Sequence, residues 1–469
     1  MKIMFLARPS YDRYSVSIYK NIKEKHNKDI EGVFITSDIE ESDYINKNVP
    51  EGVVYETSQY LRKHWDEFTE DKLLFYEEKY DCKPIWSYIL TDRFLIGKEY
   101  DYVVKITVGL FSFFENIYEY HKIDFYYSEA IATLQCYIAY LVGKKNGTIY
   151  LTQTQVRGSK DSEYHYFIYE PYQYDLNFPS NYKDIEFTQK EKREAELYLK
   201  DFEEKYTLPP GQLRLRTKPK FKFKFFFLPL KQIIKRFDKK YTDKFSYMYY
   251  KEYEHITDPI RFFFRYKKAK KYYNKADFSK KYVYFPLHYQ PEASTLVCAP
   301  KYENQIVFID ALAKSLPADT VFYIKEHYAL LGNRNLNFYN ELKKYPNIVL
   351  IDPWESSREL IENAECVVTL TGTAGYEAML LRKPVILGGH TFFEMAPGVV
   401  YVEDIFQNYV PVIQQWKMPS REEVIQYLCA SFMGYRKGNT YAQSYYHMID
   451  DNIDDIANSL YNQMLVYKN

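Results

Sequence analysis

The sequence predicts an α/β protein with two Rossmann-like domains that face one cleft and a helical basic insertion between them. Short apolar runs of β type alternate with stretches of helical period in the first part of the chain, and the pattern returns from residue 282 onward. A chain of 469 residues also exceeds what one hydrophobic core usually supports. We therefore expect a first domain over residues 1–158, an insertion over 159–280, a second domain over 281–418 and a helical tail over 419–469.

The first domain is predicted from four strand-like runs, which read KIMFLA, DIEGVFIT, DFYYSE and TIYLTQT. The stretch between the last two has helical apolar spacing and ends in Lys-Lys-Asn-Gly, which suits a helix with a C-terminal stop. Three charged residues follow strand runs of this domain, namely Arg8, Glu129 and Arg157. We expect them on the acceptor side of the cleft, with Glu129 as catalytic base or acceptor-positioning group. A solvated loop would also account for each charge.

Between residues 159 and 280 the strand pattern is expected to vanish while charge rises. The stretch KPKFKFKFFFLPLKQIIKRFDKKYTDK carries almost only positive side chains. A helical connector with a solvated basic face explains this composition, and so does a surface that meets anionic lipid headgroups. Nucleic acid is not an expected partner, because the whole chain balances 63 basic against 63 acidic residues.

The second domain is predicted from five runs, which read YVYFPL, TVFYIKE, NIVLID, CVVTLT and PVILGG. After residue 418 the pattern is helical, opened by Pro419 and a capping box of Ser420 with Glu423. We expect this tail to pack back toward the first domain.

Polar residues follow three of the second-domain strand runs. In open α/β sheets, ligands bind beyond the carboxyl ends of the strands, so these residues are expected to converge on one site. They are Gln290 and Glu292 after the first run, Lys325 and His327 after the second, and Thr371, Gly372, Thr373, Gly375 and Glu377 after the fourth.

The loop after the fourth run favours a phosphate site. A small-residue loop that runs into a helix leaves free backbone N–H groups at a positive dipole end. Glu377 would lie about one turn into that helix, where it could accept from ribose hydroxyls. His327 could donate to a phosphate and stabilise the charge that builds on a leaving nucleotide. A tight turn that only needs glycine, and a satisfied surface histidine, are the structural alternatives.

No metal, disulfide or export segment is expected. The five cysteines lie far apart without paired spacing, and the nine histidines show no zinc-ligand spacing. The apolar run at residues 3–7 is too short for a signal-peptide core. We expect a cytoplasmic protein without a cofactor, which would lie against the inner face of the plasma membrane if the basic insertion meets lipid.

Three segments, HYQPEAST, YIKEH and TLTGTAGYEAMLLRKPVILGG, resemble the capsule polysaccharide biosynthesis family in order and spacing. Some members of that family are Kdo transferases. The resemblance covers roughly residues 282–395 and implies a GT-B fold and metal-independent transfer of a sugar from a nucleotide-sugar donor. It assigns the family histidine to His327, the nucleotide loop to residues 371–375 and the loop glutamate to Glu377. One position departs from the family pattern, because Tyr328 stands where proline is usual.

Three functions remain open at this point. The first is a transferase that moves a sugar, with a CMP-Kdo-like donor as one possibility, to an oligosaccharide or lipid-linked acceptor of a capsular or surface polysaccharide. The second is a transferase of glycerol phosphate or another phosphopolyol from a CDP donor. The third is a non-catalytic subunit that binds nucleotide within a capsule assembly complex.

Overall fold

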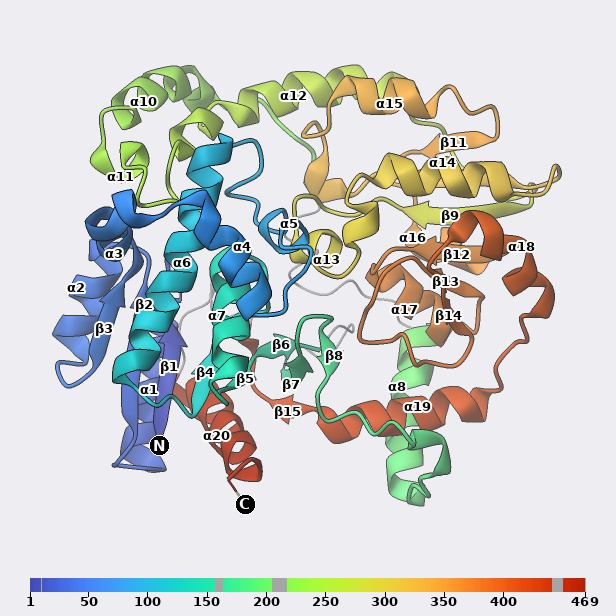
Figure 1. The fold of residues 1–469 in the computed structure, drawn as a ribbon. Helices are drawn as coiled ribbons and strands as arrows, with labels where there is room; N and C mark the ends of the chain where they lie inside the picture. The colour runs from blue at the N-terminus through green and yellow to red at the C-terminus, as the bar shows by residue number, and fades with distance from the viewer. Residues whose placement is uncertain (10, 157–162, 205–216, 441–449, 469) are drawn as a thin grey trace.

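The computed structural model describes residues 1–9, 11–156, 163–204, 217–440 and 450–468, and its chain forms two parallel sheets with helices on both faces (Figure 1). The first sheet has the order β3-β2-β1-β4-β5. All four strand runs predicted for this domain form strands. The bounds are β1 (Lys2–Leu6), β2 (Glu31–Thr36), β3 (Val53–Glu56), β4 (Phe125–Tyr127) and β5 (Ile149–Leu151). Strand β3 was not predicted, because it is a four-residue edge strand with no fully buried residue.

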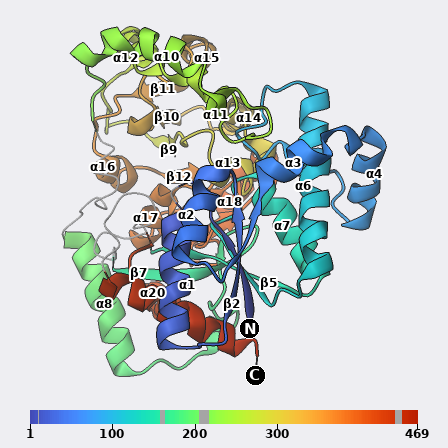
Figure 2. The same cartoon turned by 90° about the vertical axis from the view of Figure 1, so that its left-hand side faces the viewer.

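Alternating side chains of the first sheet enter two separate cores. On β1, Ile3 and Phe5 face a core that includes helix α1 (Asp12–Lys25), whereas Met4 and Leu6 face a core that includes α6 (Tyr100–Tyr120) and α7 (Leu134–Lys145). Figure 2 shows the sheet between these layers. The remaining helices of this domain are α2 (Ile39–Asn48), α3 (Thr57–His64), α4 (Glu70–Lys79) and α5 (Trp86–Ile89).

The second sheet has the order β11-β10-β9-β12-β13-β14, and all its pairings are parallel. The five predicted runs are strands, and β14 is an additional half-buried edge strand. The strands are β9 (Tyr282–Pro286), β10 (Val321–Lys325), β11 (Ile348–Ile351), β12 (Cys366–Thr369), β13 (Val385–Leu387) and β14 (Val399–Tyr401). The covering helices are α13 (Ala293–Leu296), α14 (Gln305–Ser315), α15 (Leu336–Leu342), α16 (Ser357–Glu362), α17 (Thr373–Leu380) and α18 (Ile405–Gln415).

The expectation that strands vanish after residue 158 is wrong. Strands β7 (Tyr164–Tyr169) and β8 (Tyr174–Asp175) form an antiparallel sheet with β6 (Gln153–Gln155) and β15 (Arg436–Lys437). The run YHYFIY has four buried residues in succession, but the first of them is His165, which interrupts the apolar run. In a chain with 52 tyrosines, such an aromatic run does not stand out as β-type. The described part of residues 176–280 is largely helical, with α8 (Gln189–Glu204), α10 (Leu228–Lys235), α11 (Lys239–Thr242) and α12 (Asp258–Ala269).

The tail crosses from the second domain to the first. Helix α19 (Arg421–Gly434) begins with the predicted capping box of Ser420 and Glu423 and packs in the core of the second domain. Helix α20 (Asp450–Val466) then places Ile456 and Leu460 in the first-domain core beside α1. Figure 1 shows α20 next to α1, and both chain termini lie close together. Among the described residues, we find no helix with the length and apolar character needed to span a membrane.

Candidate functional site

Both sheets reverse their strand order at a central pair of strands, which is where open α/β sheets bind ligands. If the strands of each sheet are numbered in the order in which they occur along the chain, they lie side by side in the order 3-2-1-4. The strand order therefore reverses between β1 and β4 in the first domain and between β9 and β12 in the second. Four polar residues lie at these two points, each two positions beyond the end of its strand: Arg8, Glu129, His288 and Thr371. His327 holds the same position after β10. The arrangement gives each domain one polar site at its switch point.

His288 holds the loop after β12 in place. The N–H of Thr371 donates to His288 Nε2 at 3.1 Å, and the hydroxyl of Thr369 lies 3.1 Å from the same nitrogen. The N–H of Gly372 in turn donates to Thr369 Oγ1 at 3.0 Å. Burial, reinforced by His327 and Arg334, lowers the pKa of His288 to about 3. The ring is therefore neutral, and its role is to position the loop.

The glycines of this loop allow it to lie tightly against the strand end. A Cβ on Gly372 would lie 2.8 Å from Thr369 Oγ1, and one on Gly375 would lie 2.9 Å from Thr369 Cγ2. The loop is thus a tight turn that needs glycine, which was the structural alternative. That alternative does not account for the helix that begins in the same loop. Gly372 is also the N-cap of α17, and it offers no side chain to cap the first turn. Partly exposed Thr373 begins that turn, so its backbone donors suit an anion.

Of two residues predicted to contact a nucleotide, Thr371 differs from the expectation in detail, and Glu377 lies where it was expected. The Thr371 hydroxyl donates to Ser294 O at 3.0 Å, so it links the loop to α13. Its backbone, rather than its hydroxyl, defines the loop. Glu377 lies half-buried within α17, one turn from its start, as predicted from the sequence.

His327 is a neutral hydrogen-bond donor. Its Nδ1 accepts from the N–H of Ala329 at 3.2 Å, which leaves the proton on Nε2. Burial lowers the pKa of His327 to about 4, and the charges of Arg334 and Lys325 contribute to the shift. The imidazole can thus donate to a phosphate oxygen without carrying a charge near neutral pH.

Lys325, which we predicted to bind the donor, is engaged by the chain itself. Its ammonium lies 2.7 Å from both Glu355 O and Ser357 Oγ, and its side chain is buried. These contacts attach the loop before α16 to the end of β10. The sequence could not show this, because Glu355 and Ser357 lie 30 and 32 positions further along the chain.

An ion pair that sequence reasoning missed organises the second-domain site. Arg334 Nε donates to the fully buried Glu326 carboxylate at 3.1 Å, and its Nη2 donates to His288 O at 2.6 Å. Tyr339 also donates to Glu326, at 2.8 Å. The Arg334 guanidinium therefore lies near His288 and His327, where the Glu326 carboxylate holds it in place. No motif marks this arginine, since it lies in the segment between η7 (Tyr328–Leu330) and α15.

The segment after β9 carries Gln290 and Glu292. Gln290 Oε1 accepts from Gln305 Nε2 at 2.5 Å, whereas exposed Glu292 accepts from Ser294 Oγ at 2.9 Å. The helix that follows, α13, packs in the apolar cluster of the first domain. This segment therefore reaches from the second-domain switch point to the first domain.

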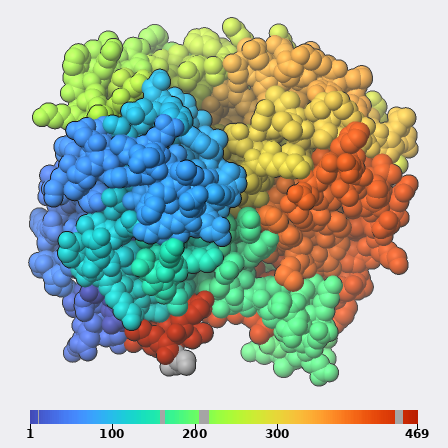
Figure 3. Space-filling model, in the orientation of Figure 1, coloured from blue at the N-terminus to red at the C-terminus, as the bar shows by residue number. Residues whose placement is uncertain are grey.

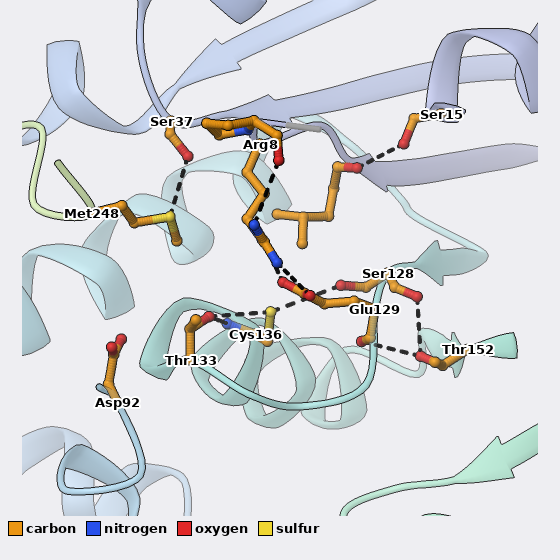
Figure 4. A network of polar contacts seen from close by, with 12 residues as sticks. Arg8, Ser15, Ser37, Asp92, Ser128, Glu129, Thr133, Cys136, Thr152 and Met248 are labelled. Atoms are coloured by element: carbon orange, nitrogen blue, oxygen red, sulfur yellow. Dashed lines mark hydrogen bonds and ion pairs between the residues drawn. The ribbon is translucent and has the colours of Figure 1, made fainter. Parts of the chain in front are cut away.

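The first-domain site is an ion pair between two residues that were predicted separately. Arg8 Nε and Nη2 donate to the two carboxylate oxygens of Glu129 (Figure 4). The centroid of the Tyr11 ring lies 4.6 Å from the guanidinium. Burial alone would lower the pKa of Arg8, but the adjacent carboxylate raises it above its ordinary value. Burial raises the pKa of the nearby Cys136 thiol to about 12, so it is no nucleophile. Arg157 lies outside the described residues.

Glu170 is a further acidic residue beside this site. We did not predict it, because it follows β7, a strand that was not predicted from the sequence. Glu170 is buried, and burial raises its pKa well above the usual value, with a contribution from Glu129. One of its oxygens accepts from the N–H of Ile131 at 3.2 Å, and the other has no protein partner. Four residues further on, Tyr174 contacts His390 and Glu394 of the second domain at 2.9 Å each. This segment joins the two domains beside the first-domain switch point.

Among the described residues, no group of three or more histidines, cysteines or acids could hold a metal ion. Whether the protein works without a metal or cofactor stays a prediction.

Two Rossmann-like domains with polar switch points form the GT-B arrangement predicted from the sequence. Residues 240–411 match the family model described as capsule polysaccharide biosynthesis protein. This segment contains the whole second sheet, so the resemblance is confirmed where its motifs lie. No curated protein matches the chain.

Solved structures that the chain resembles include two from Thermosulfurimonas dismutans. KpsC, titled beta Kdo 2,7 transferase, is 13% identical with a TM-score of 0.33, covering 75% of this chain and 89% of that one. KpsC titled beta Kdo 2,4 transferase is 13% identical with a TM-score of 0.37, covering 72% and 87%. UDP-GlcNAc 2-epimerase from Neisseria meningitidis, bound to UDP-GlcNAc, is 14% identical with a TM-score of 0.24, covering 100% of both chains. Identities and TM-scores this low decide neither donor nor acceptor.

Proposed function

We propose that the protein is a GT-B glycosyltransferase that moves a sugar from a nucleotide-sugar donor to a growing capsular or surface polysaccharide. The observation that carries the proposal is the second-domain switch point. There, His288 positions a glycine loop, α17 begins without a side-chain cap, and His327 retains an Nε2–H donor. These are donors for the phosphate of a nucleotide sugar. The family match over residues 240–411 supports the same activity.

In the proposed reaction, an acceptor hydroxyl attacks the anomeric carbon while the bond from that carbon to the nucleotide phosphate breaks. The leaving phosphate gains negative charge, which His327, the α17 N-terminus and the field of Arg334 stabilise. The acceptor hydroxyl loses its proton to Glu129 or to a base that Glu129 and Arg8 orient. No metal is needed, because the chain itself supplies the positive field.

A nucleotide panel tests the donor site. If the donor is CMP-Kdo-like or of the CDP type, we expect CMP or CDP to bind. A nucleotide present at 100 times its dissociation constant should stabilise the protein by about 2.7 kcal/mol. Thermal unfolding with each nucleoside mono- and diphosphate measures this shift. Arg334→Met serves as a control with a disrupted site. Stabilisation by none of the nucleotides would reject the donor site.

Transfer from candidate donors, with and without EDTA, then distinguishes the three functions. Sugar transfer that resists EDTA supports the proposal. Transfer of a phosphopolyol from a CDP donor would favour the second function. Nucleotide binding without turnover on any oligosaccharide or lipid-linked acceptor would favour a non-catalytic subunit.

A further inference from the structure

Helix α10 turns its apolar face away from the protein. Leu230, Ile233 and Ile234 of the helix and Phe237 just after it recur at helical spacing, and each is more than half exposed, with Phe237 81% exposed. The partly buried side of the helix consists of Leu228 and two polar residues, Gln232 and Lys235. Gln232 donates to Glu254 O at 3.4 Å, and Lys235 pairs with Asp238 at 2.9 Å. No residue of α10 is buried, so the helix is inverted relative to one that packs on a core.

The turn before α10 extends this apolar surface. In η3 (Phe223–Phe227), Phe223, Phe226 and Phe227 are each more than half exposed, and only Phe225 is buried. Phe221 links the turn to α12, with ring centroids 5.5 Å from Phe263 and 6.4 Å from Phe264. Figures 1 and 2 both show α10 and α12 along the upper edge of the molecule, where Figure 3 shows the lime-coloured surface. Monomeric soluble proteins rarely expose so many contiguous large apolar side chains.

The charge around this surface indicates what covers it. Residues 217–237 contain seven lysines and arginines and no aspartate or glutamate. A symmetric contact with a second copy would place these like charges against one another. Protein interfaces are also depleted of lysine. Anionic lipid headgroups complement the lysines, and the acyl boundary below them accepts phenylalanine and isoleucine.

The chain that follows α10 and α11 packs beside the first-domain site. Beyond α11, Ser246 Oγ donates to Asp38 Oδ2 at 2.5 Å, and the hydroxyl of Ser37 donates to Met248 Sδ at 3.5 Å. Ser37 follows β2, the neighbour of β1 in the sheet that carries Arg8. The exposed surface is therefore connected to the proposed acceptor side of the protein.

We propose that η3 and α10 form a membrane-docking surface that inserts its apolar face shallowly into an anionic bilayer. The lysines at 218, 220, 222 and 224 contact the headgroups, and Ile234 and Phe237 enter the acyl boundary. Docking would hold the first-domain site beside a membrane-borne acceptor. The inference stands independently of the transferase proposal, because binding to vesicles requires no turnover.

Vesicle co-sedimentation tests the proposal with three variants of the full chain. Wild-type protein should bind phosphatidylglycerol-containing vesicles, more tightly at low salt, and bind pure phosphatidylcholine weakly. The Lys218/Lys220/Lys222/Lys224→Gln variant should lose roughly tenfold or more in affinity for the anionic vesicles. Ile234→Asn/Phe237→Asn should lose about tenfold and retain only salt-sensitive binding. Leu74→Asn/Phe75→Asn, on the exposed face of α4, is the matched control and should bind like wild type.

Insertion is measured separately with Phe237→Trp. Brominated lipid should quench its fluorescence beyond the quenching seen in wild-type protein. Equal binding of all variants, or equal binding to neutral and anionic vesicles, would overturn the proposal. A dimer in sedimentation velocity that Ile234→Asn/Phe237→Asn abolishes would show that a second copy covers the surface. Unchanged thermal unfolding of each variant confirms that these exposed substitutions leave the fold intact.

Discussion

His327→Ala is expected to slow the transfer step far more than it weakens nucleotide binding. The substitution removes the Nε2–H donor, which interacts most strongly when the leaving phosphate gains charge. Loss of one such donor costs roughly 10²-fold to 10³-fold in turnover. It also leaves the N–H of Ala329 without its acceptor, a local loss of about 1 kcal/mol. The fold should therefore survive.

The pH dependence distinguishes a neutral donor from a cationic one. Because the folded pKa of His327 is lowered to about 4, its contribution to turnover should stay constant from about pH 5.5 to pH 8. A cationic role would instead make that contribution rise as pH falls through about 6.5. The rate ratio of wild type to His327→Ala across this range measures the difference.

The lowered pKa of His327 also predicts how the free energy of unfolding changes with pH. In the unfolded chain the histidine binds a proton below about pH 6.5, whereas in the folded chain it stays neutral until about pH 4. The stability that this neutral ring contributes is present above pH 6.5 and is lost as pH falls toward 4. His327→Ala should accordingly lose less stability than wild type over that window.

Initial-rate measurements with saturating acceptor, and urea unfolding at each pH, are the assays. His255→Ala is the matched control, because that exposed side chain precedes α12 and pairs with neighbouring Asp258. Full activity in His327→Ala, or an absolute need for magnesium or manganese, would refute the reasoning.

Three further substitutions test other parts of the two sites. Glu129→Gln should lower turnover by about two orders of magnitude with nucleotide affinity nearly unchanged, and near-normal turnover would leave Glu129 as a structural partner of Arg8. Arg334→Met leaves the buried Glu326 carboxylate unpaired and should cost about 3–5 kcal/mol in urea unfolding, so a cost below about 1 kcal/mol contradicts the assigned ion pair. Gly372→Ala should weaken nucleotide binding about tenfold by calorimetry, because its Cβ would displace Thr369 from the loop; unaltered affinity would argue against the loop as the phosphate site.

Much of the fold was predictable because parallel strands covered on both faces are continuous apolar runs. The five runs of the second domain and the four of the first all form strands. The strands that were missed differ in burial or composition. Strands β3, β8, β14 and β15 are short strands without fully buried residues, and β7 is an aromatic run in a tyrosine-rich chain. Where burial does not produce a pattern, the sequence carries no strand signal.

The sequence by itself determined which residues stand at strand ends, because the end of an apolar run and the polar residue after it are local features. Which of them meet was decided by tertiary structure. Arg8 and Glu129 are 121 positions apart, and His288 contacts a loop 83 positions away. Lys325 was predicted to bind the donor, but the fold brings Glu355 and Ser357 to its ammonium, whereas Arg334, which was not predicted, contacts His288 O. Likewise, the sequence shows that α10 is amphipathic, but only packing decides that its apolar side faces outward.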